Sequence, residues 1–346
     1  MAWNVPAGWC GADRNRATLI VRRLKIPILE TEKFHLKNYR FHILALLTVL
    51  AIMLTACAPA TSPVPPTQKP ASTATPSTQA PSPTPAEPYL GQPLPGLTPE
   101  VFAPDIVSVK GRYEYGVAVS PEGNELFFTA ESPGVGLTVI RRIDGKWTKP
   151  EAANLRGNNS WEFEAFFTVD GQRLFFASNE AGSNAAPTLW QTEKGPAGWQ
   201  PPQRLESPIN AASVFWATFT RDGTMYYTNV DKLAIYHSRQ VNSAYPAVED
   251  AGLPAGSFHP SVSPDERFLL FNSKRLQGFG GNDLFVSYRQ GDGTWGTPEN
   301  LGSEINTAYD ETCGSLSPDG RYIFFSRYDE PGGQSNIYWV SSAVLP

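Results

Sequence analysis

Hydrophobic and polar positions from about residue 98 onward follow a pattern that recurs five times. In each copy a hydroxyl residue opens a short polar stretch, and an apolar run of aromatic and aliphatic residues follows, as in Ser317-Pro-Asp-Gly-Arg-Tyr-Ile-Phe-Phe. Pro and Gly favour a tight turn, and the apolar run suits a strand buried on both faces. The hydroxyl residues are Ser120, Thr168, Thr220, Ser263 and Ser317. Their spacing of about 50 residues indicates a repeated structural unit.

Each copy continues beyond its apolar run. A third strand is predicted next, as at 137–142, and three copies then carry a Trp followed three residues later by Pro. These are Trp147, Trp199 and Trp295, and their recurrence at the repeat period favours packing between units over a ligand cage. A closing segment such as 299–306 completes four strands, which is the size of a β-propeller blade.

We therefore predict an all-β fold, a β-propeller of five four-stranded blades. Six blades are less favoured because no long unassigned segment remains to hold another. The last copy ends after its third strand, and a lone strand-like segment at 102–111 precedes the first copy. This N-terminal strand is expected to complete the last blade, close the ring and remove exposed sheet edges. In the fourth copy Glu266 replaces the turn Gly, so that turn is expected to differ or to be strained.

Polar side chains recur on the strand before each turn, which in a propeller lines the central channel. The candidates for ligand binding, which stand four, six or seven residues before the turn hydroxyl, are Glu114, Glu162, Glu164, Trp216, His259, Asp310 and Glu311. Positions four and six share one side of an extended strand, so the carboxylates are expected near one channel mouth, beside an exposed Trp216. Such a group suits a sugar, a cationic group or calcium. The alternative is that these residues line a solvated tunnel or hydrogen-bond to loops.

A catalytic role would fall to the same carboxylates. If the protein is an enzyme, the acid and base are expected among Glu114, Glu162, Glu164 and Glu311, as in glycosidic hydrolysis by paired carboxylates. The spacing does not distinguish an acid from a nucleophile, and we expect binding in preference to catalysis. The chain has no phosphate-binding glycine motif and no arguable Ser–His–Asp spacing.

Cysteine, histidine and charge exclude further classes. Cys10, Cys57 and Cys313 show no CxxC spacing, so neither a disulfide framework nor a Cys-based zinc site is predicted. Cys313 is expected to be a buried small hydrophobe, and only His237 and His259 lie beyond the stalk. No cofactor is expected, with calcium the one cation left open. The net charge of −5 lacks the basic surplus of a nucleic-acid binder.

The N-terminal region has the pattern of an export signal. An apolar run at 43–56 follows several basic residues and, at about 21 Å as a helix, is shorter than the roughly 30 Å core of a membrane. It ends in Leu54-Thr-Ala-Cys57, which closely resembles the bacterial lipobox and implies a lipid on Cys57. Because the segment before the apolar run is unusually long, translation is expected to start near Leu36.

Three regions follow from these patterns. Residues 1–56 are the predicted signal sequence, 57–97 the lipidated Cys with a stalk rich in Pro, Thr and Ser, and 98–346 the propeller. Proline fixes φ and lacks an N–H, so the stalk can form neither helix nor ladder. It is expected to be an extended spacer that reaches on the order of 100 Å.

The repeats resemble the WD40-like repeats of TolB-type β-propellers. Together with the segment 283–311 and the terminal Asn336-Ile-Tyr-Trp-Val, they are similar to a large group of exported bacterial propellers of unassigned function. The resemblance covers about residues 98–346 and implies fold more than activity.

We expect a membrane-anchored, extracytoplasmic binding module on a monomeric propeller. The lipid on Cys57 would hold it to the outer face of the cell membrane, or in the outer membrane or periplasm. Its partner would be an envelope protein or a glycan, and not a nucleic acid. The alternative is a glycan-active hydrolase that uses the channel-mouth carboxylates.

Overall fold

The computed structural model describes residues 89–131, 136–157, 160–180, 185–328 and 335–346. The predicted signal sequence, the start near Leu36, Cys57 and most of the stalk lie outside these residues. Among the described residues, no helix is long and apolar enough to cross a membrane. The helical elements seen there are three short 3-10 turns, η1 (Tyr89–Gly91), η2 (Ile209–Ala211) and η3 (Ser342–Val344).

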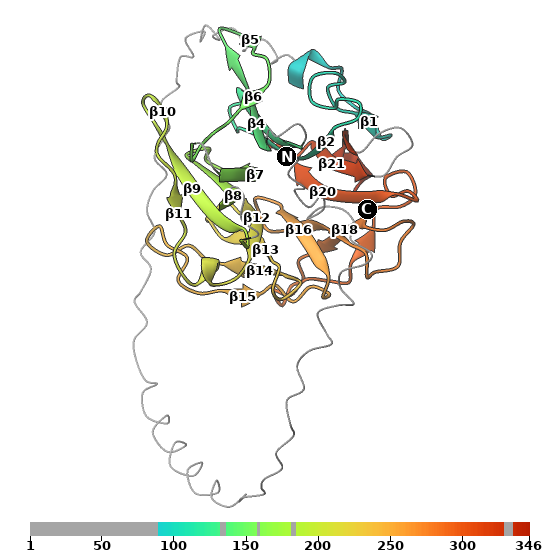
Figure 1. The fold of residues 1–346 in the computed structure, drawn as a ribbon. Coiled ribbons are helices and arrows are strands. Elements are labelled where there is room, and N and C mark those ends of the chain that lie inside the picture. Colours follow the sequence, from blue (N-terminus) through green and yellow to red (C-terminus); the bar gives the residue numbers. More distant parts are fainter. Residues whose placement is uncertain (1–88, 132–135, 158–159, 181–184, 329–334) are drawn as a thin grey trace, which may run out of the picture. The chain divides into compact units, whose positions relative to one another are not determined.

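The described strands form five antiparallel sheets arranged as the blades of a ring (Figure 1). The first blade contains β2 (Tyr113–Val119), β3 (Glu125–Glu131), β4 (Gly136–Ile143), β5 (Lys146–Trp147) and β6 (Glu151–Ala152). The second contains β7 (Ser160–Phe167), β8 (Arg173–Glu180), β9 (Thr188–Gly195), β10 (Gly198–Trp199) and β11 (Gln203–Arg204). The third contains β12 (Val214–Phe219), β13 (Met225–Asn229), β14 (Ala234–Ser238) and β15 (Glu249–Asp250).

The fourth blade contains β16 (Ser257–Val262), β17 (Phe268–Ser273), β18 (Asp283–Tyr288) and β19 (Glu299–Asn300). The last contains β20 (Asp310–Leu316), β21 (Tyr322–Tyr328), β22 (Ser335–Ser341) and β1 (Glu100–Val101). The innermost strands β2, β7, β12, β16 and β20 contact one another in a closed cycle. The predicted five-bladed propeller is therefore confirmed.

The hydroxyl at the start of each repeat holds its turn together. Thr168 Oγ1 donates to Asp170 Oδ1 at 2.6 Å, and Ser317 Oγ donates to Asp319 Oδ1 at 2.6 Å. The same two oxygens accept the backbone N–H five residues further on, at 3.1 and 3.0 Å. Each turn thus satisfies its own polar groups before the chain enters the buried second strand.

The fourth turn keeps the common geometry despite its Glu. The last turn position has φ of 67° at Gly171 and 69° at Gly320, and Glu266 adopts 57°. A side chain in this left-handed region costs on the order of 1 kcal/mol. Glu266 Oε1 accepts a hydrogen bond from Tyr226 of the neighbouring blade at 2.5 Å, which offsets part of that cost. The expected strain is present, while the shape of the turn is unchanged.

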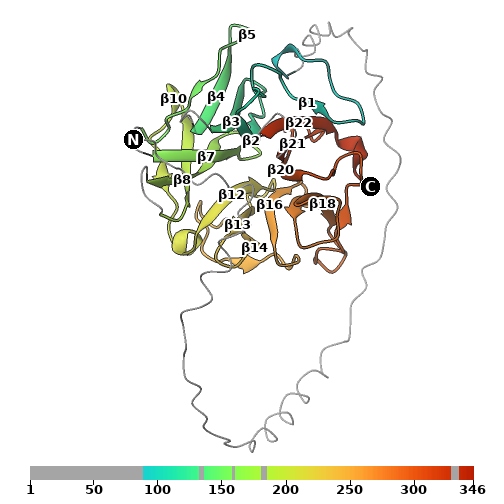
Figure 2. The ribbon, with the colours of Figure 1, turned by 45° about the vertical axis from the view of Figure 1, so that its right-hand side comes forward.

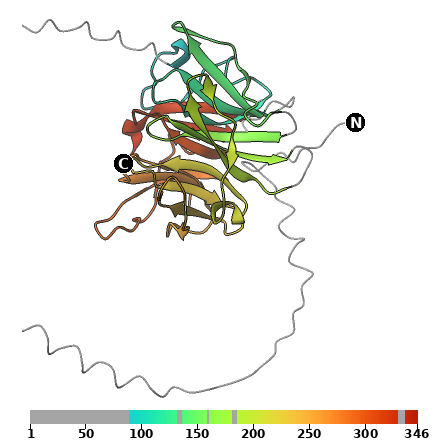
Figure 3. The same ribbon diagram turned by 90° about the vertical axis from the view of Figure 1, so that its left-hand side faces the viewer.

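The N-terminal segment closes the ring as predicted. Strand β1 pairs antiparallel with β22, so that Glu100 lies opposite Trp339 and Val101 opposite Tyr338. The teal N-terminal segment lies beside the red last blade (Figure 2). Seen from the side, that blade lies between the teal segment and the orange fourth blade (Figure 3). The strand itself comes just before the predicted 102–111.

The segment predicted as the closing strand turns instead. Pro104 lacks an N–H, and its neighbours Ala103 and Asp105 have left-handed φ values of 41° and 64°. Ser108 Oγ then accepts the N–H of Ile337 and donates to its carbonyl, both at 3.1 Å. The Ser108 hydroxyl therefore makes the two hydrogen bonds to Ile337 that the backbone of a paired strand makes elsewhere in the sheet.

The Asn of the closing motif has the same role in two other blades. The side chain of Asn210 accepts the N–H of Leu189 at 2.8 Å and donates to its carbonyl at 2.8 Å. Asn306 makes the same pair with Leu284, at 2.8 and 2.9 Å. The recurrence of Asn at this place in the repeat follows from its paired donor and acceptor.

The last blade also contacts residues assigned above to the stalk. The ring of Tyr89 lies edge-on to the rings of Tyr322, Phe324 and Trp339, with centroids 5.9 to 6.1 Å apart. Edge-to-face packing of this kind stabilises by roughly 0.5–1.5 kcal/mol per pair beyond area burial. Packing against the propeller thus begins at least nine residues before position 98.

The Phe102→Ala variant tests how strongly stability depends on ring closure. Phe102 is fully buried, with ring centroids 5.0 Å from Phe324 and 5.1 Å from Trp339. We expect the free energy of unfolding, measured by urea denaturation, to fall by about 3–5 kcal/mol. The control Ile106→Ala, at a side chain that is 40% exposed, should change it by less than about 0.5 kcal/mol. Equal effects of the two substitutions would refute closure by this segment.

Candidate functional site

The inner strand of every blade contains a β-bulge at the same place. In each, the pairing with the second strand shifts by one residue, for example between Tyr115 and Ala118. The extra residues lie four positions before the turn hydroxyl, have left-handed φ values of 51° to 66°, and are Gly116, Glu164, Trp216, His259 and Cys313. A bulge redirects the side chain of its extra residue. The alternation used to place the candidate carboxylates on one side therefore does not continue through this point.

The five extra residues meet at the centre of the ring. A side chain at Gly116 would meet Glu164 Cγ at 3.3 Å and Trp216 Cζ3 at 3.5 Å, so Gly leaves room for both. Trp216 lies edge-on to His259 with centroids 4.9 Å apart, and His259 Nε2 is 3.6 Å from Glu164 Oε1. One side-chain ligand atom each from Glu164, His259 and Cys313 lies within 4.8 Å of the others. We call these three residues the axial cluster.

Trp216 was expected to be exposed, and this is wrong. Its side chain is fully buried, and its Nε1 donates to the carbonyl of Pro260 at 2.9 Å. Its ring centroid is 4.4 Å from that of Phe166. The bulge turns Trp216 into the ring, where it packs against His259 of the axial cluster. No exposed aromatic face is therefore offered to a sugar at this position.

Hydroxyl groups of neighbouring blades support the axial cluster. The backbone N–H of Glu164 donates to Thr129 Oγ1 at 2.9 Å, and that of His259 donates to Thr228 Oγ1 at 3.0 Å. Both Thr residues stand at the same position of their own second strands. Each hydroxyl thus satisfies a buried N–H that the bulge removes from the ladder.

A chain of hydrogen bonds links the candidate Asp310 to His259. Asp310 Oδ1 accepts from Asn282 Nδ2 at 2.9 Å, and Asn282 Oδ1 accepts from Asn272 Nδ2 at 3.0 Å. Asn272 Oδ1 is 2.7 Å from His259 Nδ1. Because the carboxylate only accepts, both amides are oriented by it, and His259 Nδ1 carries the proton. The lone pair of His259 Nε2 then faces the axial cluster.

Glu162 and Glu311 anchor the loops that precede their own strands. Glu162 accepts from the N–H groups of Leu155 and Arg156, at 2.9 and 2.6 Å. Glu311 accepts from the N–H and hydroxyl of Thr307, at 2.9 and 2.6 Å, and burial raises its pKa. Both side chains are buried, so they follow the alternative stated for the candidates, hydrogen bonding to loops.

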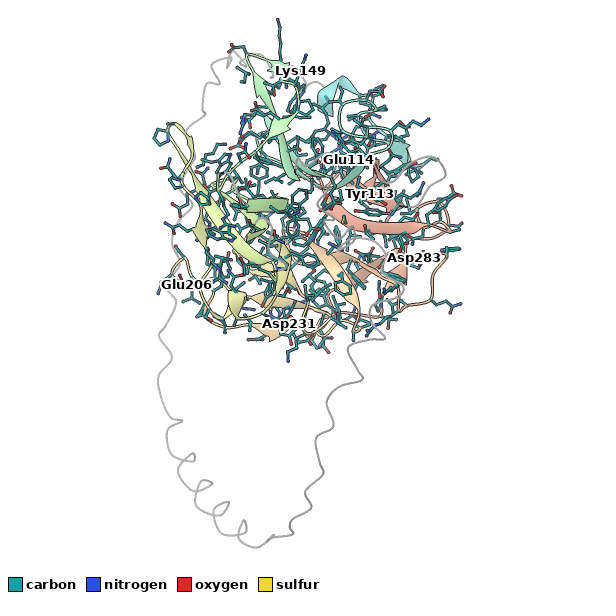
Figure 4. The ribbon with its side chains drawn as sticks, viewed as in Figure 1. Tyr113, Glu114, Lys149, Glu206, Asp231 and Asp283 are labelled. Carbon is teal, nitrogen blue, oxygen red and sulfur yellow. The ribbon has the colours of Figure 1, made fainter. Side chains whose placement is uncertain are left out.

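Glu114 does the same in the first blade. It lies at the start of β2 beside the last blade (Figure 4), where it accepts from the Val109 N–H at 3.2 Å and from Arg112 Nε at 2.5 Å. Burial raises the pKa of Glu114 to about 7, although the hydrogen bond and charge of Arg112 act in the opposite direction. Of the candidates, the structure thus joins Glu164, Trp216 and His259, and uses Glu114, Glu162 and Glu311 to hold loops.

An open depression in the described surface lies away from these candidates, between the first two blades. We call it the inter-blade groove. It has a volume of about 650 Å³ and lies between residues 141–143 of the first blade and 194–200 of the second. The hairpins that end in β5 and β10 both extend outward from the ring (Figure 1).

Polar and apolar groups alternate along the inter-blade groove. Glu125 Oε1 accepts from Arg141 Nε at 3.2 Å and from Trp199 Nε1 at 3.3 Å, which ties the two blades together. Arg142 and Ile143 line the same groove, and Ile143 is 57% exposed. The expected role of Trp199 in blade packing is confirmed. The repeat pattern marks Trp199 but not the groove, because the groove depends on how hairpins of two adjacent blades lie relative to each other.

Comparisons with known proteins concern the fold. The chain matches no protein-family model, and it matches no curated protein. It is similar to the structure of putative TolB from Agrobacterium tumefaciens, with 16% identity, a TM-score of 0.46, and coverage of 66% of this chain and 77% of that chain. It is also similar to TolB from Acinetobacter baumannii, with 15% identity, a TM-score of 0.42, and coverage of 66% of this chain and 57% of that chain. A thermostable family-43 glycoside hydrolase has 12% identity and a TM-score of 0.48, with coverage of 66% of this chain and 89% of that chain. Similarity at this level assigns neither ligand nor activity.

The raised pKa of Glu114 predicts a pH-dependent stability. Its ordinary value is 4.5, so between pH 4.5 and about 7 the folded protein retains a proton that the unfolded chain has lost. The stabilisation is therefore complete below about pH 4.5 and lost as the pH rises through about 7. We expect the unfolding free energy of the wild type, minus that of Glu114→Gln, to fall by about 2 kcal/mol over this range in urea titrations.

The partner of Glu114 provides the control. Arg112→Met removes the cation that lowers the pKa of Glu114. In this background the decrease in the stabilisation provided by Glu114 should therefore extend to higher pH. A wild-type minus Glu114→Gln difference that does not vary with pH would show that burial leaves this carboxyl unperturbed.

Proposed function

We propose that this protein is an extracytoplasmic binding module and that it recognises a protein partner in the inter-blade groove. The observation that supports this most is the groove itself. Its volume of about 650 Å³ lies within the roughly 300–1,000 Å³ typical of ligand sites. It lies between two hairpins that extend from adjacent blades, where a segment of another chain has access.

The side chains of the inter-blade groove favour a protein partner over a glycan. Trp and Arg are enriched at protein interfaces, and both line this groove as Trp199, Arg141 and Arg142. Ile143 adds an exposed apolar side chain. A partner that buries this side chain gains binding free energy from removing its apolar surface from water. The acceptor Glu125 already holds Arg141 and Trp199 in place, so little side-chain entropy is lost on binding.

The sequence pattern supports a location outside the cytoplasm for this module. An apolar run at 43–56 ending at Cys57 supports export and lipid attachment, and the Pro-rich stalk supports presentation at a distance from the membrane. We include the lipid on Cys57 and the envelope location in the proposal. Loss of membrane association in a Cys57→Ala variant is the direct check on this part.

The hydrolase alternative has no specific observation in its favour. Glu114, Glu162 and Glu311 accept hydrogen bonds from their own loops, and Glu164 is buried. A general acid must reach the oxygen that it protonates, and these side chains are 5% exposed or less. Binding remains the function that the described surface supports best.

Site-specific photo-crosslinking tests the inter-blade groove. A photoreactive side chain is placed at Ile143, which is 57% exposed in the groove, or at Phe279, which is 53% exposed and lies outside it. In the full-length protein in its own cell envelope, we expect one recurrent protein adduct from position 143 and none from 279. With that partner purified, Ile143→Ser and Arg142→Glu should each raise the dissociation constant about 10- to 30-fold, and Phe279→Ser should not.

Other outcomes separate the alternatives. Equal affinity of wild type, Ile143→Ser and Arg142→Glu for the partner would exclude the groove as the binding face. A glycan that binds the wild type and loses affinity in the groove variants would replace the protein partner. Turnover on a glycan panel that Glu162→Gln or Glu311→Gln abolishes in a folded protein would restore the hydrolase.

A further inference from the structure

We propose that the axial cluster of Glu164, His259 and Cys313 binds one divalent transition-metal ion of the zinc class at the centre of the ring. The three residues come from β7, β16 and β20, so a single ion would join three of the five blades. The proposal is independent of the inter-blade groove.

The donor set and its distances suit zinc. Zinc in proteins takes Cys sulfur, His nitrogen and carboxylate oxygen, and the axial cluster provides one of each. The distance of 3.6 Å between His259 Nε2 and Glu164 Oε1 is close to the ~3.4 Å of a tetrahedral zinc site. The widest separation among the three ligand atoms is at most 4.8 Å, roughly 1 Å beyond such a site. A small rotation of the side chains therefore brings all three within bonding range.

The hydrogen bonds around the cluster prepare its atoms as ligands. A metal-bound His usually donates its other ring N–H to an oxygen that is itself held in place. His259 Nδ1 does so to Asn272, which is oriented through Asn282 by Asp310. His259 Nε2 thus lies 3.6 Å from Glu164 Oε1, and both atoms belong to the group of potential ligand atoms that includes Cys313 Sγ.

The charge at this place also favours a cation. Glu164 is 1% exposed, and a buried carboxylate is costly unless a positive charge compensates it. The Thr312 hydroxyl lies 3.5 Å from Cys313 Sγ and donates a hydrogen bond to it. A divalent ion with one thiolate and one carboxylate forms a neutral unit.

The same donors select against calcium, the cation left open by the sequence. Calcium requires six to eight oxygen ligands, whereas nitrogen and sulfur provide two of the three atoms here. Glu114, Glu162 and Glu311, which could have supplied oxygens, accept hydrogen bonds from their own loops. A soft or borderline ion is therefore the class that these residues fit.

The test measures metal content after refolding, because the cluster is at most 2% exposed and an ion would enter as the ring closes. The full-length protein is unfolded in denaturant with a chelator present. It is then refolded with Zn²⁺, Co²⁺ or Ca²⁺ and desalted. We expect one zinc per chain and, with Co²⁺, a sulfur-to-cobalt absorption band in the near ultraviolet. At zinc concentrations 100-fold above the dissociation constant, the melting temperature should rise by about 5–10 °C. Calcium should have no effect.

The variants assign the site. Cys313→Ser, His259→Gln and Glu164→Gln should each lose the bound zinc and the rise in melting temperature. Trp216→Phe is the matched control, because residue 216 holds the equivalent left-handed position and contacts His259 but offers no ligand atom. It should keep one zinc per chain. Asn272→Ser, which leaves all three ligands in place, should weaken zinc binding about 10- to 100-fold.

Several results would overturn the proposal. If the wild type is refolded with zinc and retains no zinc after desalting, the proposal is wrong, whatever the variants show. Zinc that persists equally in Cys313→Ser and His259→Gln would place the ion elsewhere. A cobalt complex that lacks the sulfur band, or a calcium-induced rise equal to that of zinc, would exclude the Cys313 thiolate as a ligand.

Discussion

The one-residue bulge in each inner strand controls what the centre of this propeller contains. It forces the extra residue into the left-handed region, at a cost on the order of 1 kcal/mol for each residue other than Gly. It also removes that residue from the ladder and turns its side chain toward the ring axis. Trp216, Glu164, His259 and Cys313 therefore meet in a buried space that Gly116 leaves open. Thr129 and Thr228 satisfy two of the N–H groups left over, so the bulges are compatible with a dry interior.

The position two residues before the bulge has a different role. Glu114, Glu162 and Glu311 bring a buried carboxylate to the loop that enters each strand, and backbone N–H groups of that loop donate to it. Such charge-assisted bonds are stronger than neutral ones. They fix the loops that enter the first, second and last blades, while β1 and Ser108 join the first segment to the last blade. A buried carboxylate thus holds the entering loop in three of the five blades, while strand pairing and the Ser108 side chain join chain segments over 200 residues apart.

Function is supported where the blades depart from their common plan. In the first two blades the third strand continues into hairpins that reach β5 and β10, and the inter-blade groove lies between them. The axial cluster likewise depends on differences, because the equivalent position holds Gly in one blade, Trp in another and three ligand-type residues in the rest. The repeated positions form the scaffold, and both proposed sites lie where single repeat positions differ between blades.

The sequence by itself determined the five blades, the turn residues and the closure by an N-terminal segment, because these depend on local patterns that repeat. Their shared place, four residues before each turn hydroxyl, also put Glu164, Trp216 and His259 in one set. Only the tertiary structure decided that Trp216 is buried, that Cys313 joins Glu164 and His259, and that the other carboxylates hold loops. The physical reason is the bulge: a single extra residue reverses the side that each later side chain faces, and neither residue type nor spacing reveals it. Contacts between residues of different blades, such as Trp199 with Glu125, depend on how the blades pack and have no counterpart in local sequence.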